Sequence, residues 1–184
     1  MSEKETVSLS VAYRLLHPMH VALISCVGKD GKPNIITLAW VMPTSIRPPM
    51  VAISVGPARH SHALIEETGE FTVNIPTFDI LKETFYCGSI SGRNRNKFEE
   101  ACLTPLPSRK VKPPAIKECI AHLECKLHSK LPTGDHTIFV GEVVEAYADK
   151  GIFDGEVYNI EKAKMIYHVG GAYFATLHPK VVTP

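Results

Sequence analysis

The sequence predicts a mainly β protein, a closed or split antiparallel β-barrel with short decorating helices. Segments rich in β-branched and apolar residues recur along the chain, and turn-forming residues join several of them at hairpin spacing. The helical candidates between these segments are short. Many strands at hairpin spacing, with only short helices between them, favour an antiparallel barrel.

The first half of the chain contains the clearest strand and turn signals. Asp30-Gly31 is a favourable hairpin turn. Ser61 is the expected N-cap of a helix, and Gly69 is its expected C-terminal stop. We expect strands at residues 20–27, 33–41, 50–55 and 70–75, and helices at residues 11–16 and 60–68.

In the second half, apolar and polar residues alternate from Cys119 to His128. This alternation predicts a half-buried strand, with residues 137–147 as its hairpin partner across a turn at residues 131–135. The proline-rich stretch 104–114 is interpreted as a long connection within one domain. The remaining expected elements are short helices at 78–86 and 96–101 and short strands at 157–160 and 165–169.

Length and composition limit the classes of function. The 184 residues fit a single domain over residues 1–184, and a net charge of +1 argues against nucleic acid or an anionic membrane as a partner. The five cysteines are odd in number, and no apolar run approaches the roughly 20 residues of a membrane span. With no signal-peptide pattern at residues 1–10, we expect a cytoplasmic protein with reduced thiols.

The turn after the strand at 50–55 has the chemistry of a phosphate anchor. Small residues precede Arg59 and open a helix, so backbone N–H groups and a positive helix end lie together. Arg59 adds a charge-assisted contact and Ser61 a hydroxyl. The alternative is a capped helix with a solvated arginine, and this segment alone favours that alternative.

A second basic cluster lies in the Gly/Ser/Asn-rich loop from Ser89 to Lys97. Its hydroxyls and cations are able to serve the same phosphate, whose charge needs compensation in a partly buried site. A solvated surface loop is the competing interpretation, and composition alone leaves the two nearly even.

The order of these motifs resembles the flavin reductase-like family of FMN-binding split barrels, which includes flavoredoxin-like and ferric-reductase-like proteins. The resemblance covers roughly residues 14–175. The matching pieces are His17-Pro18, Gly31 to Asn34, Thr37 to Trp40, Pro48-Pro49, Val55 to Ser61, Gly69 to Ile75, Gly134 to Val143 and Tyr167 to Tyr173.

The resemblance implies FMN as the cofactor, NADH or NADPH as the electron donor, and a homodimer with the cofactor near its interface. It places Thr37, Ala39 and Trp40 along the flavin ring, and Asn74 near the ribityl chain. The ribityl and phosphate groups are assigned to Ser54, Val55, Arg59, His60 and Ser61, with Cys87, Gly88, Ser89, Ser91 and Lys97 closing over the phosphate.

The implied activity is that of an NAD(P)H-dependent flavin reductase that passes electrons to free flavin, a metal complex or a protein. His136 is the candidate for positioning the nicotinamide, against an equal expectation of a turn histidine bonded to the backbone. His168 and Tyr173 are weaker candidates for the cofactor cleft.

Other functions remain as alternatives. One is an electron carrier whose FMN is reduced by a protein partner, and a more distant one is a nucleic-acid-binding barrel that uses Arg93, Arg95 and Lys97. A metal site is not expected. Cys119 and Cys125 lie six residues apart on one strand, about 20 Å at strand rise, and His122 faces the other side.

Overall fold

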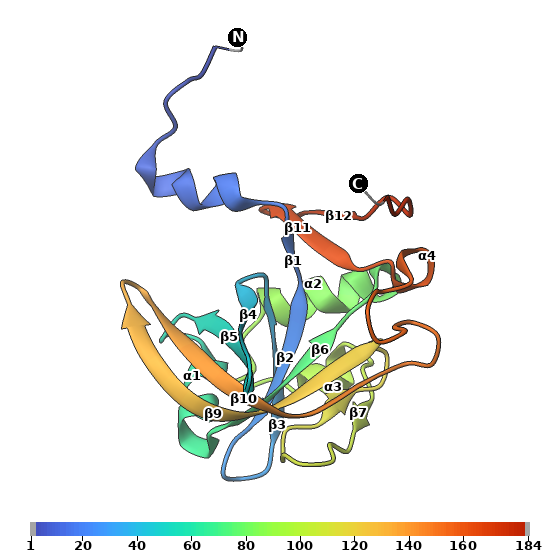
Figure 1. Cartoon of the computed structure of the whole chain (residues 1–184). Helices are drawn as coiled ribbons and strands as arrows, with labels where there is room; N and C mark the ends of the chain where they lie inside the picture. Colours follow the sequence, from blue (N-terminus) through green and yellow to red (C-terminus); the bar gives the residue numbers. More distant parts are fainter. Residues whose placement is uncertain (1–2, 183–184) are drawn as a thin grey trace.

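The structure is a computed structural model, which describes residues 3–182 (Figure 1). A seven-stranded antiparallel sheet in the order β3-β2-β6-β9-β10-β5-β4 forms the split barrel. Its strands are β2 (Ala22–Val27), β3 (Pro33–Leu38), β4 (Val41–Ile46), β5 (Pro49–Val55), β6 (Glu70–Ile75), β9 (Ala121–Thr133) and β10 (His136–Ala148).

Large apolar side chains fill the barrel. Ile24, Ile53, Phe71 and Phe139 are fully buried there. A Cβ at Gly141 would lie 2.5 Å from Cζ of Phe71, so glycine on β10 is what lets this ring fill the centre.

A second apolar cluster lies on the outer faces of β2 and β3. Leu23 and Ile35 pack there with Phe98 and Ile116 and are fully buried or nearly so. Burial on both faces explains why these two strands are almost continuously apolar in sequence. The covering elements include η2 (Phe78–Ile80), α2 (Leu81–Ser89) and α3 (Lys97–Glu100).

Helix α1 (His60–Thr68) has the expected bounds and the expected end. Gly69 adopts φ 68°, and its N–H donates to the carbonyl of Ile65. The expected N-cap was wrong, because Arg59 occupies that position and Ser61 lies inside the first turn. The Ser61 hydroxyl instead accepts a hydrogen bond from Asn34 Nδ2 at 2.7 Å.

The strand expected at residues 119–128 is present as the first part of β9, but its half-buried character was wrong. Both faces are covered in its first half, where His122 is 4% exposed and Glu124 is not exposed at all. The proline-rich connection supplies the second cover, with β7 (Pro105–Leu106) paired to β8 (Ala115–Ile116). β9 then continues to Thr133, so the hairpin turn contains only Gly134 and Asp135.

Two terminal segments gather at one end of the barrel, at the top of Figure 1. The 3-10 helix η1 (Leu9–Leu16) leads into β1 (Met19–His20), which pairs with β11 (Ile166–Gly170). β12 (Tyr173–Thr176) completes this three-stranded sheet. Among residues 3–182, no helix combines the length and the hydropathy needed to cross a membrane.

Two short elements differ from expectation. β4 was not predicted, because an exposed edge strand that contains Pro43 lacks a buried face. The strand expected at 157–160 is wrong: helix α4 (Ile160–Ala163) begins there, capped by the Asn159 side chain, which accepts from Lys162 N at 3.2 Å.

Candidate functional site

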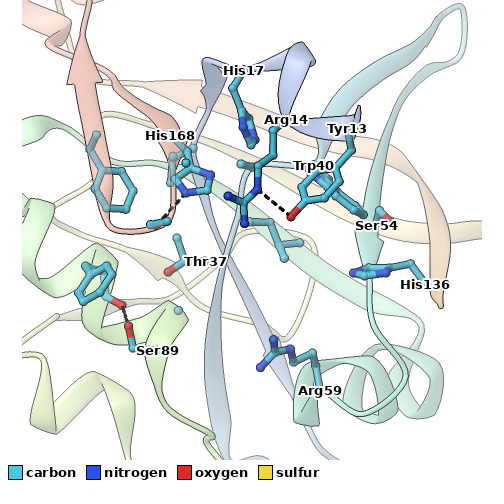
Figure 2. Close-up of a pocket in the computed structure, with 18 residues that line it drawn as sticks. Tyr13, Arg14, His17, Thr37, Trp40, Ser54, Arg59, Ser89, His136 and His168 are labelled. Carbon is cyan, nitrogen blue, oxygen red and sulfur yellow. Dashed lines mark hydrogen bonds between the residues drawn. The ribbon is translucent and has the colours of Figure 1, made fainter. Parts of the chain in front are cut away.

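A cavity of about 370 Å³ opens where the barrel meets the terminal segments (Figure 2). Its floor is the end of β3 with the residues that follow it, from Thr37 to Trp40, together with Ser54 of β5 and Gly88 of α2. Helix η1 and the β11–β12 hairpin form the opposite wall. We call this space the aromatic cavity because of the side chains that surround it.

Seven rings from six separate segments surround the aromatic cavity. Successive ring centroids lie 4.7–6.2 Å apart, within the range of edge and tilted aromatic contacts. This aromatic rim consists, in order, of His136, Trp40, Tyr13, His17, His168, Phe174 and Phe85. The rim presents apolar ring faces and few hydrogen-bonding groups, which suits a planar, conjugated molecule.

A second cavity of about 170 Å³ adjoins the first, since Arg59 and Gly88 line both. We call it the cationic cavity. Arg59, Arg93 and Lys97 line it together with the hydroxyls of Ser61 and Ser91. None of the ion pairs within residues 3–182 involves any of these three cations.

Lys97 is a buried cation at the base of the cationic cavity. Its side chain is 3% exposed, and Nζ donates to the carbonyls of Ile35 at 2.8 Å and Cys87 at 2.6 Å. Burial lowers the pKa of this ammonium group. Burial, and then the charges of Arg93 and Lys97, also lowers the pKa of His60 on the same cavity wall.

Two glycines let the α2 region approach β3 closely. A Cβ at Gly88 would lie 3.0 Å from Cβ of Thr37, and one at Gly92 would lie 1.9 Å from Oδ1 of Asn34. That Asn34 oxygen is buried and has no hydrogen-bond partner among the residues that the structure describes. The loop after α2 therefore packs against β3 through backbone, which leaves the cationic cavity open beside it.

Most of the site residues expected from sequence border these two cavities. Thr37, Ala39, Trp40, Ser54, Ser89 and His136 line the aromatic cavity; His60, Ser61, Cys87, Ser91 and Lys97 line the cationic cavity; Arg59 and Gly88 line both.

Val55 and Asn74 border neither cavity. The Val55 side chain lies in the barrel core at 1% exposure. Asn74 is fully buried, where Nδ2 donates to the Leu23 carbonyl and Oδ1 accepts from Ile116 N, both at 3.0 Å. Its hydrogen bonds hold β2, β6 and β8 together.

His136 lines the cavity from the start of β10. Its Nδ1 donates to Oδ1 of Asp135 at 2.7 Å, and this contact lowers the pKa of the Asp135 carboxyl. The imidazole also lies 4.7 Å from the Trp40 ring, so two contacts fix its orientation. His168 lines the cavity as well, whereas Tyr173 is 77% exposed and does not.

Sequence reasoning missed the wall opposite the barrel except for His168. Tyr13, Arg14 and His17 enter the cavity from η1, and Phe85 and Phe174 enter from α2 and β12. The only local signal was the four-residue spacing of Tyr13 and His17, which places both rings on one face of a helical turn.

Cys87 lines the cationic cavity without being a reactive thiol. It is fully buried, and burial raises its pKa to about 11, so the thiol stays protonated near neutral pH. Its part in the site is therefore to pack against the second apolar cluster and to present its carbonyl to Lys97.

Comparison with known proteins gives one consistent family. The family model described as the flavin reductase like domain matches residues 13–174. An uncharacterized protein of Archaeoglobus fulgidus is 43% identical over 141 residues, which are 77% of this chain and 78% of that protein. A flavin reductase of Pseudomonas putida is 26% identical over 161 residues, 88% of this chain and 86% of that protein.

Among solved structures, flavoredoxin of Desulfovibrio vulgaris (Miyazaki F) superposes with a TM-score of 0.87 and 27% sequence identity. The match covers 99% of this chain and 97% of the flavoredoxin. The similarity therefore extends over the barrel and both of its terminal segments.

Proposed function

Because this chain belongs to the family of the flavin reductase like domain, we propose that it binds FMN and acts as an NAD(P)H-dependent flavin reductase. The observation that supports this most is the joining of the aromatic cavity to the cationic cavity at Arg59 and Gly88. FMN consists of a planar ring, a polyol chain and a phosphate, so its ring matches the aromatic cavity and its phosphate matches the cationic cavity.

The cationic cavity suits the phosphate. Arg59 and Arg93 are cations without a carboxylate partner among residues 3–182, and Ser61 and Ser91 add hydroxyls. A phosphate ester carries about −1.5 to −2 charges at neutral pH, which would compensate these cations and the buried Lys97. The unpartnered Asn34 oxygen beside them is available to a hydroxyl donor.

The aromatic cavity suits the ring. A volume of about 370 Å³ lies within the range of small-molecule sites, roughly 300–1,000 Å³. We assign the backbone from Thr37 to Trp40 to the polar edge of the ring, and the aromatic rim to its exclusion from water. When bound, FMN supplies two-electron transfer from a reduced nicotinamide to an acceptor.

The protein's own part in the reaction is to bind and orient FMN and the nicotinamide and to exclude water from the site. The contacts of His136 with Asp135 and Trp40 hold its imidazole at the cavity wall, and we propose that this ring positions the nicotinamide. Hydride transfer does not require a residue that removes a proton from carbon. The composition of the site agrees with this, because cations and aromatic rings line it and its one carboxylate-bonded histidine is His136.

The proposal is tested on the purified protein by its visible absorption. We expect a yellow protein, or a colourless one that becomes yellow on addition of one equivalent of FMN, and bleaching under anaerobic conditions on addition of NADH or NADPH. A colourless protein that does not bind added FMN would contradict the proposal.

A second candidate function is an electron carrier that receives electrons from a protein. The similarity to a flavoredoxin over 99% of the chain favours it as the alternative. The same experiment separates the two functions, because a carrier would bind FMN and yet remain yellow with both nucleotides, while dithionite would bleach it.

We also propose a homodimer in a reducing, cytoplasmic environment. Leu15, Leu16 and Tyr173, on the segments that wall the aromatic cavity, are 70%, 73% and 77% exposed, and a subunit interface would cover such large apolar side chains. All five cysteines are free. Analytical ultracentrifugation tests the dimer: we expect about twice the 20.3 kDa of one chain, and a single-chain mass would contradict it.

A further inference from the structure

The end of the aromatic cavity that faces η1 contains a cation of its own. Arg14 lines the cavity, and Figure 2 shows its side chain extending from η1 into the space between His168 and Tyr13. Arg59 enters from the opposite side in the same view. The two arginines therefore mark two different ends of the site.

Most of the hydrogen-bonding capacity of Arg14 is unused. Its Nε donates to the Tyr13 hydroxyl at 3.3 Å, and no ion pair among residues 3–182 includes this guanidinium. A guanidinium has five N–H donors in a planar fork that matches carboxylate, sulfonate or phosphate oxygens. The side chain is thus free to form the bidentate contact for which arginine is suited.

The surroundings of Arg14 are aromatic and leave its charge unopposed. The rings of His17 and His168 lie 5.0 Å apart beside it. The pKa of His17 is lowered by burial first, and then by the charges of His168 and Arg14. The side chains that line this end of the cavity include no aspartate or glutamate, so an anion that reaches it meets uncompensated positive charge between aromatic rings.

The phosphate of FMN does not account for Arg14. On the proposed function, on which this inference rests, that phosphate belongs to the cationic cavity, where Arg59 lies. We propose that Arg14 binds the acidic group of the second substrate, a planar conjugated molecule that bears a phosphate, sulfonate or carboxylate and lies against the aromatic rim. A nicotinamide nucleotide and an acidic quinone both have this chemistry.

The electron balance is that of a two-electron transfer. The reduced nicotinamide loses two electrons and one proton, and a quinone acceptor gains two electrons and two protons, the second proton coming from solvent. Arg14 takes no part in the bond changes and serves as a positioning residue for whichever anionic partner occupies the cavity.

The test compares anionic and neutral probes in Arg14→Ala, Arg14→Lys and a control, Arg47→Ala, which removes an exposed arginine that does not line the cavity. The probes are NADH, 1,4-naphthoquinone-2-sulfonate and the neutral 2-methyl-1,4-naphthoquinone. Dissociation constants are read from visible difference spectra of oxidised, FMN-loaded protein with each quinone, and KM and kcat are measured separately.

For Arg14→Ala we expect roughly ten-fold weaker binding of the sulfonate or a roughly ten-fold higher KM for NADH, as is typical for loss of a charge-assisted hydrogen bond. Binding of the neutral quinone and of FMN should change less than two-fold, and lysine should restore part of the loss. An effect on NADH alone identifies the donor as the bound anion, and an effect on the sulfonate alone identifies the acceptor.

Two results would overturn the role of Arg14. One is an equal loss of affinity for the anionic and the neutral quinone, and the other is an Arg14→Ala variant in which both the KM for NADH and the affinity for the sulfonate stay unchanged. The control should match the unsubstituted protein, and thermal unfolding of each variant verifies the fold. Failure of the unsubstituted protein to bind FMN is a separate result, which would contradict the proposed function itself.

Discussion

The side of the barrel that the 104–116 connection covers (the closed side) and the side that borders the two cavities (the open side) each contain a buried side chain that carries a full charge, Glu124 and Lys97 respectively. On the closed side, Glu124 accepts hydrogen bonds from the backbone N–H groups of Arg109 at 2.8 Å and Lys110 at 2.6 Å. On the open side, Lys97 bonds only to two carbonyls and borders a cavity that also holds Arg59 and Arg93. The chain thus bonds one buried charge to its own backbone donors, whereas the other charge borders the cavity to which the proposed function assigns a phosphate.

The largest expected effect is on the closed side. Glu124→Ala removes the acceptor of two backbone N–H groups and releases the 104–116 connection, so we expect the free energy of unfolding to fall by about 3–5 kcal/mol. Urea unfolding measures this loss, and affinity for FMN in the protein that remains folded should stay within about three-fold.

Glu124→Gln is the matched control, because it retains one acceptor oxygen and the side-chain volume. It should cost roughly half as much as alanine. If both variants unfolded like the unsubstituted protein, Glu124 would not be the anchor of the connection.

The next effect is on the open side and concerns binding. Lys97→Met keeps the length of the side chain and removes its charge, so we expect roughly 10- to 100-fold weaker FMN binding, measured by titration of the apoprotein. Stability should change by less than about 1.5 kcal/mol, because two lost hydrogen bonds are offset by removal of the cost of burying an ammonium group.

The two variants should therefore show opposite profiles, with stability lost at Glu124 and affinity lost at Lys97. Riboflavin, which lacks the phosphate, should bind the unsubstituted protein and Lys97→Met equally. A large stability loss in Lys97→Met with unchanged FMN affinity would remove the distinction between the two sides.

A smaller effect is expected where the loop after α2 packs against β3. Gly92→Ala would place a Cβ 1.9 Å from Asn34 Oδ1, and Asn34 is held by its bond to Ser61, so the loop must move. We expect about 1–2 kcal/mol of lost stability and several-fold weaker FMN binding. Asn34→Ala in the same chain removes the clash, so the double variant should be less destabilised than the sum of the two single variants.

The smallest expected effect is a pH dependence on the closed side. Burial lowers the pKa of His122, whose Nδ1 lies 2.8 Å from Asn74 Oδ1. The unfolded chain then binds more protons below pH 6.5, so stability falls as the pH drops from 6.5 toward the folded-state pKa. His122→Asn should reduce the dependence of stability on pH, and the contribution of this single group cannot exceed about 1.4 kcal/mol per pH unit. An unchanged dependence between pH 6.5 and 5 would contradict the role of His122.

Local sequence signals predicted the barrel well. Turn residues and alternation located β2, β6, β10 and α1, because each has its own hairpin turn, buried face or glycine stop. Burial of both faces of β9 was not predictable, since it depends on the 104–116 connection folding back over His122 and Glu124. The exposed edge strand β4 had no apolar face to reveal it.

The candidate site likewise has parts that local sequence signals predicted and parts that depend on tertiary contacts. The turn at Arg59 and the loop to Lys97 were predictable, because each combines small residues with charge within a short stretch. The end of β3 contains no charged residue, and only the family resemblance pointed to it. The wall that holds Tyr13, Arg14 and Phe174 was not, because η1 and β12 meet the barrel only through tertiary contacts. The link from Asn74 to Ile116 was missed for the same reason.

Trp40 has a consequence for spectroscopy. It is the only tryptophan of the chain, and its ring lies in the wall of the aromatic cavity, 5.8 Å from Tyr13 and 4.7 Å from His136. Its emission therefore comes from one known place, without a label. A flavin in that cavity would quench the emission by energy transfer, and departure of η1 would shift it to longer wavelength.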